Sequence, residues 1–290
     1  MSEYKESELI INSDGSIYHL KLQPGQIADT IIVVGDPDRV PEVSKYFDKI
    51  ETKVQNREIV THTGFFNNKR LSVLSTGMGT DNIDIVMNEL DALVNIDFKT
   101  RAQKNKLTAL NIIRLGTSGA IQPDIPTDAV AISVAGLGLD GLLNFYRIDK
   151  DILNVELADA FIKHVDWNKN LPKPYAVEGS KFLLDKIGKD FYQGITATAP
   201  GFYGPQGRVL RLGIQNPELN EKMQTFNFNG ERIINFEMET SALYGLGGLL
   251  GHNMITVCAV IANRVNNTYN KDYKKVIESL IKTVLERLTS

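Results

Sequence analysis

The stretch Thr30–Val40 (TIIVVGDPDRV) constrains the fold of this chain more than any other segment. Its first residues, TIIVV, form an uncharged run that is typical of a parallel strand buried on both faces. The run ends at Gly35, and Asp36–Val40 is predicted to open a helix. A glycine turn between a strand and a helix can present backbone N–H groups to an anion, to which Arg39 would add positive charge. Many such turns only cap a helix, so the stretch predicts a strand–turn–helix unit and leaves the anion site open.

The same pattern recurs along the chain. Leu71–Ser75 leads through STGMGTDN into an amphipathic helix predicted over Asn82–Asn95. Further strands are predicted at Glu58–Phe65, Leu107–Gly116, Ala129–Ala135, Gly194–Ala199 and Met254–Ala262. Strands that alternate with helices favour the α/β class. We therefore predict a single α/β domain with a central mixed, largely parallel twisted β-sheet flanked by helices.

Composition limits the partners of this domain. The 290 residues carry a formal net charge of -3 and a sequence pI near 5.9, which argues against nucleic-acid binding and against a membrane surface. Cys258 is the single cysteine and lies in an apolar run, so we interpret it as a core thiol. No run approaches transmembrane length, and the protein is predicted to be cytoplasmic.

The N-terminal region divides into two parts. Residues 1–16 are polar and acidic and are predicted to be a flexible arm, with residues 17–290 as one catalytic domain. The alternation in IYHLKL at 17–22 predicts a short strand that carries His19.

The segment Phe236–Ala242 (FEMETSA) contains two acids, Glu237 and Glu239, on either side of Met238. At the end of a strand the two carboxylates would share one face of the pleat. The uncharged stretch Thr240–Gly251 that follows predicts a buried helix. The acids could perform acid/base work or could favour the helix dipole, and at this point both interpretations stand.

Arg114 lies near the end of an apolar strand candidate, where a charge is costly unless an anion or a carboxylate compensates it. The hydroxyls of Thr117 and Ser118 follow within a glycine-containing turn, which favours an oxyanion site. A structural ion pair with a glutamate is the alternative.

The loop GFYGPQGR combines an aromatic ring, an amide and a guanidinium at Phe202, Gln206 and Arg208. These groups suit a flat heterocycle that stacks on the ring and bonds through its polar edge. A loop rich in glycine and proline can also exist without a function.

Together these motifs resemble those of the nucleoside phosphorylase family, and within it those of the enzymes that act on uridine. The resemblance covers most of the chain and keeps the order of IYHLKL, GDPDRV, NRE at 56–58, STGMG, RLGTSGAIQP, GFYGPQGR, NFEMETSA and VIANR. It implies that phosphate attacks the anomeric carbon of a nucleoside and that the base leaves, giving ribose 1-phosphate. No nucleophilic side chain and no cofactor is required; phosphate is a co-substrate.

The resemblance also implies a role for individual residues, with Arg114, Glu239, Arg208 and Gln206 as the catalytic group. Phosphate would be held by Gly35, Arg39, Arg114 and Thr117, with Arg57 from a neighbouring subunit. Ribose would contact Met238 and Glu239, with His19 of the neighbour. The base would lie against Phe202, Gln206, Arg208, Ile261 and Ala262. Two residues supplied in trans imply at least a homodimer, with a hexamer as the larger option.

The chain departs from the family pattern in three places. Asn263 stands where purine-cleaving relatives carry an aspartate, which favours a pyrimidine. The base loop has Gly204 and Pro205 exchanged relative to the usual FYxGQxR, so its path is open. Some relatives bind a monovalent cation near the position of Glu58, but the companion serine is Asn82 here, and no metal is predicted.

Four alternatives stay open beside uridine phosphorolysis. They are a purine nucleoside phosphorylase, a hydrolytic nucleosidase, a non-catalytic nucleoside-binding protein and, last, a dinucleotide-binding dehydrogenase. The dehydrogenase lacks the expected GxGxxG after the first strand.

Overall fold

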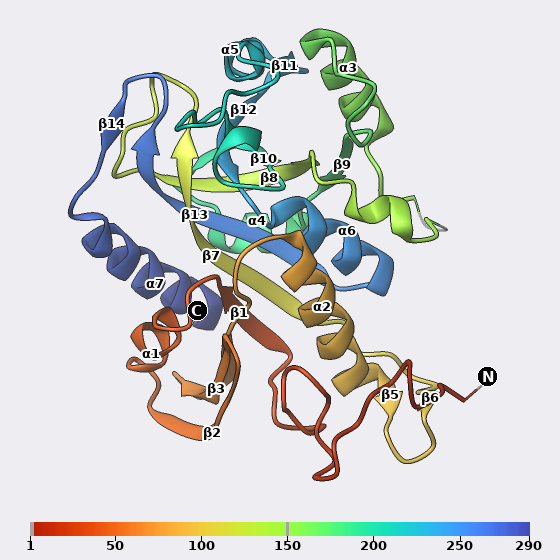
Figure 1. The fold of residues 1–290 in the computed structure, drawn as a ribbon. Helices are drawn as coiled ribbons and strands as arrows, with labels where there is room; N and C mark the ends of the chain where they lie inside the picture. The colour runs from red at the N-terminus through yellow and green to blue at the C-terminus, as the bar shows by residue number, and fades with distance from the viewer. Residues whose placement is uncertain (1–2, 149–150) are drawn as a thin grey trace.

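The computed structural model describes residues 3–148 and 151–290 and shows a large twisted sheet with helices on both faces (Figure 1). The strands of the large sheet are β1 (Thr30–Val34), β2 (Lys49–Asn56), β3 (Ile59–Phe66), β4 (Lys69–Ser75), β7 (Asn111–Ala120), β8 (Val130–Gly138), β9 (Tyr175–Glu178), β10 (Tyr192–Thr198), β11 (Asn227–Phe228), β12 (Glu231–Glu237), β13 (Asn253–Asn263) and β14 (Thr268–Tyr269). A separate hairpin joins β5 (Ile96–Asp97) to β6 (Ala102–Gln103).

The helices flank this sheet. They are α1 (Arg39–Ser44), α2 (Thr80–Asn95), α3 (Val155–Val165), α4 (Lys181–Ile187), α5 (Leu219–Thr225), α6 (Thr240–Leu250) and α7 (Tyr273–Thr289), with two 3₁₀ turns, η1 (Leu142–Phe145) and η2 (Gly204–Gln206). Helices α2 and α6 lie together on one side of the sheet, whereas α4 and α7 cover the other side (Figure 1). Within the described residues, no helix is both long and apolar enough to cross a membrane.

The strand order is β11-β12-β10-β8-β13-β7-β1-β4-β3-β2. The central pairs β4–β1, β1–β7 and β7–β13 are parallel, as are β8–β10 and β10–β12, whereas β8–β13 and the β2–β3–β4 meander are antiparallel. The predicted single α/β domain with a mixed, largely parallel sheet is confirmed.

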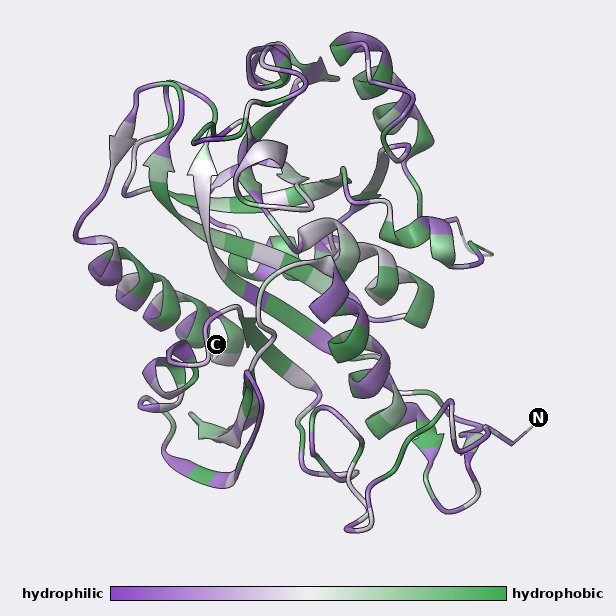
Figure 2. Ribbon diagram, in the orientation of Figure 1, coloured by the Kyte–Doolittle hydropathy of each residue, from purple (hydrophilic) through white to green (hydrophobic). Residues whose placement is uncertain are grey.

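The core forms between the sheet and its helices because the central strands are apolar on both faces. Every residue of β1 is buried, and β1 and β13 are largely green in the hydropathy colouring (Figure 2). Helix α7 alternates between green and purple, and it buries one stripe against the sheet, including Ile277, Ile281 and Val284.

The described part of the N-terminal segment is packed against the domain, which corrects the prediction of a flexible arm over residues 1–16. The guanidinium of Arg101 donates to the carbonyls of Tyr4 and Leu9, and the Tyr4 amide donates to the Arg101 carbonyl. Leu9 is buried. Residues 1 and 2 lie outside the described residues. The polar composition of residues 1–16 gave no sign of this anchoring, because Arg101 binds backbone carbonyls, which every sequence contains.

Two further predictions about local structure are wrong. The segment 17–22 forms turns instead of a strand, with only an isolated bridge between Ile11 and Ile17. Strand β7 does not end at Gly116 but continues through Ala120, because the small residues TSGA keep pairing with β13 and then meet β12.

Candidate active site

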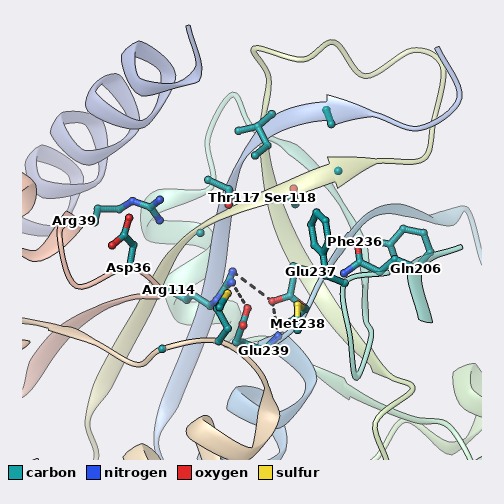
Figure 3. Close-up of a pocket in the computed structure, with 18 of the residues that line it drawn as sticks. Asp36, Arg39, Arg114, Thr117, Ser118, Gln206, Phe236, Glu237, Met238 and Glu239 are labelled. Atoms are coloured by element: carbon teal, nitrogen blue, oxygen red, sulfur yellow. Dashed lines mark hydrogen bonds and ion pairs between the residues drawn. The ribbon is translucent and has the colours of Figure 1, made fainter. Parts of the chain in front are cut away.

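A cavity of about 820 Å³ opens at the carboxyl ends of the parallel strands. Ligands of open α/β sheets bind at this edge, where the loops after several strands converge. The cavity takes residues from β7, from the ends of β1, β12 and β13, and from the loop that contains η2 (Figure 3). Eleven of the predicted site residues line it: Gly35, Arg39, Arg114, Thr117, Phe202, Gln206, Arg208, Met238, Glu239, Ile261 and Ala262.

Arg114 lies at the centre of the cavity and is paired with both acids of the FEMETSA segment (Figure 3). Its Nη2 donates to Glu239 Oε2, and its Nη1 lies 3.4 Å from Glu237 Oε2 and 3.2 Å from Cys258 Sγ. Burial disfavours the charged guanidinium, but the two carboxylates outweigh burial and raise the pKa of Arg114. The ion-pair interpretation of Arg114 therefore holds in this structure, at a position that also faces the cavity.

Glu237 fixes the start of α6. Its carboxylate accepts hydrogen bonds from the backbone N–H of Glu239 at 2.9 Å, from that of Thr240 at 2.9 Å, and from Thr198 Oγ1 at 2.6 Å. Burial raises the pKa of Glu237, and Arg114 opposes this shift. Glu237 thus satisfies helix N–H groups that would otherwise be unpaired, so the helix-cap interpretation applies to this acid.

Glu239 has a different environment from Glu237. Its Oε1 accepts from the Gly79 amide at 2.7 Å, and its Oε2 accepts from Arg114. Strand β12 ends at Glu237, so the two acids do not share a pleat. They converge on Arg114 because the chain turns into α6, and Met238 between them also lines the cavity.

The second cation of the predicted phosphate site, Arg39, begins α1. Its Nη1 lies 3.4 Å from the Leu115 carbonyl oxygen. Burial lowers its pKa, with Asp36 opposing and Arg114 reinforcing the shift. Arg39, Arg114, Gly35 and Thr117 therefore bring two cations, a backbone turn and a hydroxyl to one end of the cavity, an arrangement that suits an oxyanion.

The other end of the cavity is formed by the loop around η2. Arg208 Nη1 donates to Gln206 Oε1 at 2.7 Å and to the Phe202 carbonyl at 2.7 Å. The guanidinium also lies 3.7 Å from the centre of the Phe202 ring, so one face of this ring is covered by Arg208. Burial lowers the pKa of Arg208 to about 10, and the positive charge of Arg264 adds to the effect.

His19 and Arg57 do not line this cavity. Arg57 is exposed at the tip of the β2–β3 hairpin. The side chain of Asn56 donates to the His19 carbonyl at 2.9 Å, and the His19 ring lies 2.6 Å from Glu89 on α2. The two residues predicted to act in trans are thus held near each other at the surface.

Several cavity residues were missed by the sequence prediction. They include Asp36, Phe236, Arg264 and Tyr269, whereas Ser118 and Glu237 were recognised as candidates without being assigned to phosphate, ribose or base. Asp36 and Arg264 belong to the motifs GDPDRV and VIANR and could have been included on that ground. Tyr269 on β14 lies outside every motif of the sequence analysis and gave no signal.

The two positions considered for a cation, Glu58 and Asn82, both line the cavity. Within residues 3–148 and 151–290, no three His, Cys, Asp or Glu side chains gather in a way that could hold a metal ion.

Most of the chain matches a known protein family. The family model described as Phosphorylase superfamily matches residues 29–289. The chain belongs to the phosphorylase superfamily. Both the cavity and the sheet that carries it therefore lie within the matched region.

Individual phosphorylases are similar over most of their length. The uridine phosphorylase of Thermococcus kodakarensis is 30% identical over 283 residues, covering 95% of this chain and 87% of the relative. A DeoD-type purine nucleoside phosphorylase of Colwellia psychrerythraea is 28% identical, covering 83% and 85%. A crystal structure of a Trypanosoma brucei nucleoside phosphorylase, described as showing uridine phosphorylase activity, is 30% identical and aligns with a TM-score of 0.84 over 97% of this chain and 99% of that one.

Proposed function

We propose that this protein catalyses the phosphorolysis of uridine. In this reaction a phosphate oxygen forms a bond to the anomeric carbon of ribose while the bond from that carbon to N1 of uracil breaks. The electron pair of the broken bond leaves with the base, which takes up the proton that the attacking hydrogen phosphate gives up, and the products are uracil and ribose 1-phosphate. The reaction would serve pyrimidine nucleoside catabolism and salvage. The free thiol of Cys258 is compatible with a reducing compartment such as the cytoplasm.

The hydrogen bond between Gln206 and Arg208 is the observation that favours uracil as the base. Because Arg208 donates to Gln206 Oε1, the amide group keeps its Nε2 hydrogens and a second Oε1 lone pair for a ligand. The Gln206 amide nitrogen, the Gln206 amide oxygen and the Arg208 guanidinium therefore present a donor, an acceptor and a donor to a ligand. The edge of uracil reads acceptor, donor, acceptor through O2, N3–H and O4, which makes the two complementary.

The cationic end of the cavity supports phosphate as the attacking group. Arg39 and Arg114 supply charge there, and phosphate brings negative charge beside the sugar as it becomes oxocarbenium-like. A hydrolytic nucleosidase would have less use for these cations. Glu239 would hold the ribose hydroxyls, and Arg208 with Gln206 would stabilise the charge on the leaving base.

We further propose that the functional unit is at least a homodimer. The side chain of Asn56, next to Arg57, binds the His19 carbonyl, and neither Arg57 nor His19 lines the cavity of its own chain. In a two-fold dimer each subunit would offer this pair to the other subunit's site. The chemistry as proposed needs no cofactor and no metal, only phosphate as co-substrate.

The experiment that tests the function measures uracil release from uridine by the purified protein, with and without phosphate and with inosine alongside. Release only with phosphate, and faster from uridine than from inosine, supports the proposal. Release without phosphate would identify a nucleosidase, preference for inosine would identify a purine phosphorylase, and no release from either nucleoside would favour a binding protein.

A further inference from the structure

A row of buried polar side chains crosses four neighbouring strands and ends in the cavity. Ser133 Oγ on β8 lies 2.5 Å from Thr196 Oγ1 on β10, which donates to Asn235 Oδ1 on β12 at 2.6 Å. Asn235 Nδ2 then donates to Ser118 Oγ on β7 at 2.9 Å. Ser133, Thr196 and Asn235 have no exposed surface, and Ser118 is 5% exposed.

Such a row needs an explanation, because apolar side chains of similar size would fill the same space without the cost of burying polar groups. Of its four members only Ser118 lines the cavity, where it lies between Thr117 and Phe236 (Figure 3). The register of the sheet agrees, since Gly119 pairs with Phe236 on one side and with Ala262 on the other. Ser118 is therefore the residue through which the hydrogen-bonded row reaches the cavity.

The direction of the hydrogen bonds determines what Ser118 can do. An amide nitrogen only donates, so Ser118 Oγ must accept from Asn235 and keeps its own proton. The hydroxyl of Thr196 donates its single proton to Asn235 Oδ1. The hydroxyl of Ser133 must therefore donate to Thr196 Oγ1. Within residues 3–148 and 151–290, Ser118 Oγ makes no other hydrogen bond to a side chain or to the backbone. Its O–H is thus free for a ligand.

We propose that the Ser133–Thr196–Asn235 row is a positioning device that orients the Ser118 O–H into the cavity as a hydrogen-bond donor to the departing base. This inference rests on the proposed phosphorolysis of uridine. Hydrogen bonds that point the same way polarise one another, so the row strengthens the last donor. The donor gains most where negative charge develops on a carbonyl of the leaving uracil.

Two substitutions test this device, with a matched control. Ser118→Ala removes the donor itself, and Thr196→Val removes the bond that orients Asn235 without touching the cavity. Thr63→Val is the control, because Thr63 is equally buried and bonds a serine, Ser72 Oγ, at 2.7 Å outside the cavity. Each variant is assayed with uridine and with 5-fluorouridine, whose fluorine makes the base a better leaving group.

We expect Ser118→Ala to lower kcat/KM for uridine by roughly 10- to 100-fold and to lower it clearly less for 5-fluorouridine. Thr196→Val is expected to show the same bias with a smaller loss, and the double variant should lose no more than Ser118→Ala alone. Thr63→Val should lose thermal stability without a substrate bias.

Three results would overturn the proposal: equal losses on both substrates, wild-type kinetics for Thr196→Val, or additive losses in the double variant. A row that only fixes strand register would lower the melting temperature of Thr196→Val and leave the substrate ratio unchanged. With the Asn235 amide turned over, Ser118 would donate to Asn235, and its removal would show no leaving-group dependence.

Calorimetric titration with uracil separates this proposal from the proposed reaction. Ser118→Ala and Thr196→Val should both weaken uracil binding, and Thr63→Val should bind as the wild type does. If the wild type binds uracil but does not release it from uridine in phosphate, the proposed reaction fails while the role of the row is still decided by these affinities. Unchanged affinities in both variants would count against the row.

Discussion

Arg114 and Glu239 form a buried ion pair in the cavity, in which Arg114 Nη2 donates to Glu239 Oε2. The other oxygen of Glu239 accepts from the Gly79 amide. The carboxylate is thereby fixed from two sides by groups on β7 and before α2. This fixed orientation is what a residue needs in order to select the hydroxyls of a ribose.

Replacing Glu239 by glutamine keeps the shape of the side chain and removes its charge. We expect Glu239→Gln to lower kcat/KM for uridine by roughly 10²- to 10³-fold, because a neutral amide binds the ribose hydroxyls less strongly. The loss should be smaller with 2′-deoxyuridine, which lacks one of those hydroxyls. Steady-state assays with both nucleosides check this, and equal losses would remove Glu239 from the ribose site.

Mixed oligomers test the contribution of Arg57 in trans. Arg57→Ala and Glu239→Gln should each be nearly inactive alone. After the two variants are unfolded together and refolded, random two-fold dimers should recover about a quarter of wild-type activity, because one site in each mixed dimer is intact. Refolding each variant separately is the control. A mixture that is no more active than its components would show that Arg57 does not act across subunits.

The low pKa of Arg208 predicts an alkaline limit to activity. Burial, helped by Arg264, lowers this pKa to about 10, so the guanidinium loses its proton, and its charge, as pH rises through about 10. We expect kcat/KM to fall there. Arg264→Gln removes the neighbouring charge, which raises the Arg208 pKa and should move the limit to higher pH. Ionisation of uridine affects both proteins alike, so an unchanged limit in the variant would contradict the assignment.

Asn263 is a structural residue and not a base-selecting one. Its Nδ2 donates to the carbonyls of Gln122 at 2.8 Å and Ile125 at 2.9 Å, and its Oδ1 accepts from two following amides. It does not line the cavity. Asn263→Asp would place a carboxylate against two carbonyls and should cost about 1–3 kcal/mol of folding free energy.

The Asn263→Asp variant also tests whether the side chain at position 263 faces the base. Because the side chain points into the turn, Asn263→Asp should gain no inosine cleavage, as measured by hypoxanthine release. Wild-type stability together with new inosine cleavage would mean that residue 263 faces the base after all. The inference from Asn263 to a pyrimidine therefore loses its support, and the choice of base now depends on Gln206 and Arg208.

Most of the fold was predictable because its strands and helices carry strong local patterns. The uncharged run of β1 and the helical periodicity of α2 indicated these elements within a few residues. Strand β2 was missed because it alternates between exposed and half-buried residues and buries no apolar face. Strand β7 was ended too early because its last four residues resemble a turn, although pairing with β13 keeps them extended.

The sequence predicted most of the residues that line the site, but it did not predict which of them contact one another. Strand ends gave Gly35, Arg114 and Glu239, but the bond from Gly79 to Glu239 joins residues 160 positions apart and appears only in the folded chain. Covering of the Phe202 ring by Arg208 likewise follows from the loop conformation. Local patterns cannot specify such long-range or loop-dependent geometry.

The identity of the sugar product distinguishes phosphorolysis of uridine from hydrolysis. Uridine, phosphate and the protein are mixed and followed by ³¹P nuclear magnetic resonance while uracil is quantified in the same sample. Phosphorolysis of uridine predicts one ribose 1-phosphate for each uracil, and formation of uridine when these two products are supplied instead. Uracil accompanied by free ribose, with the phosphate signal unchanged, would contradict it.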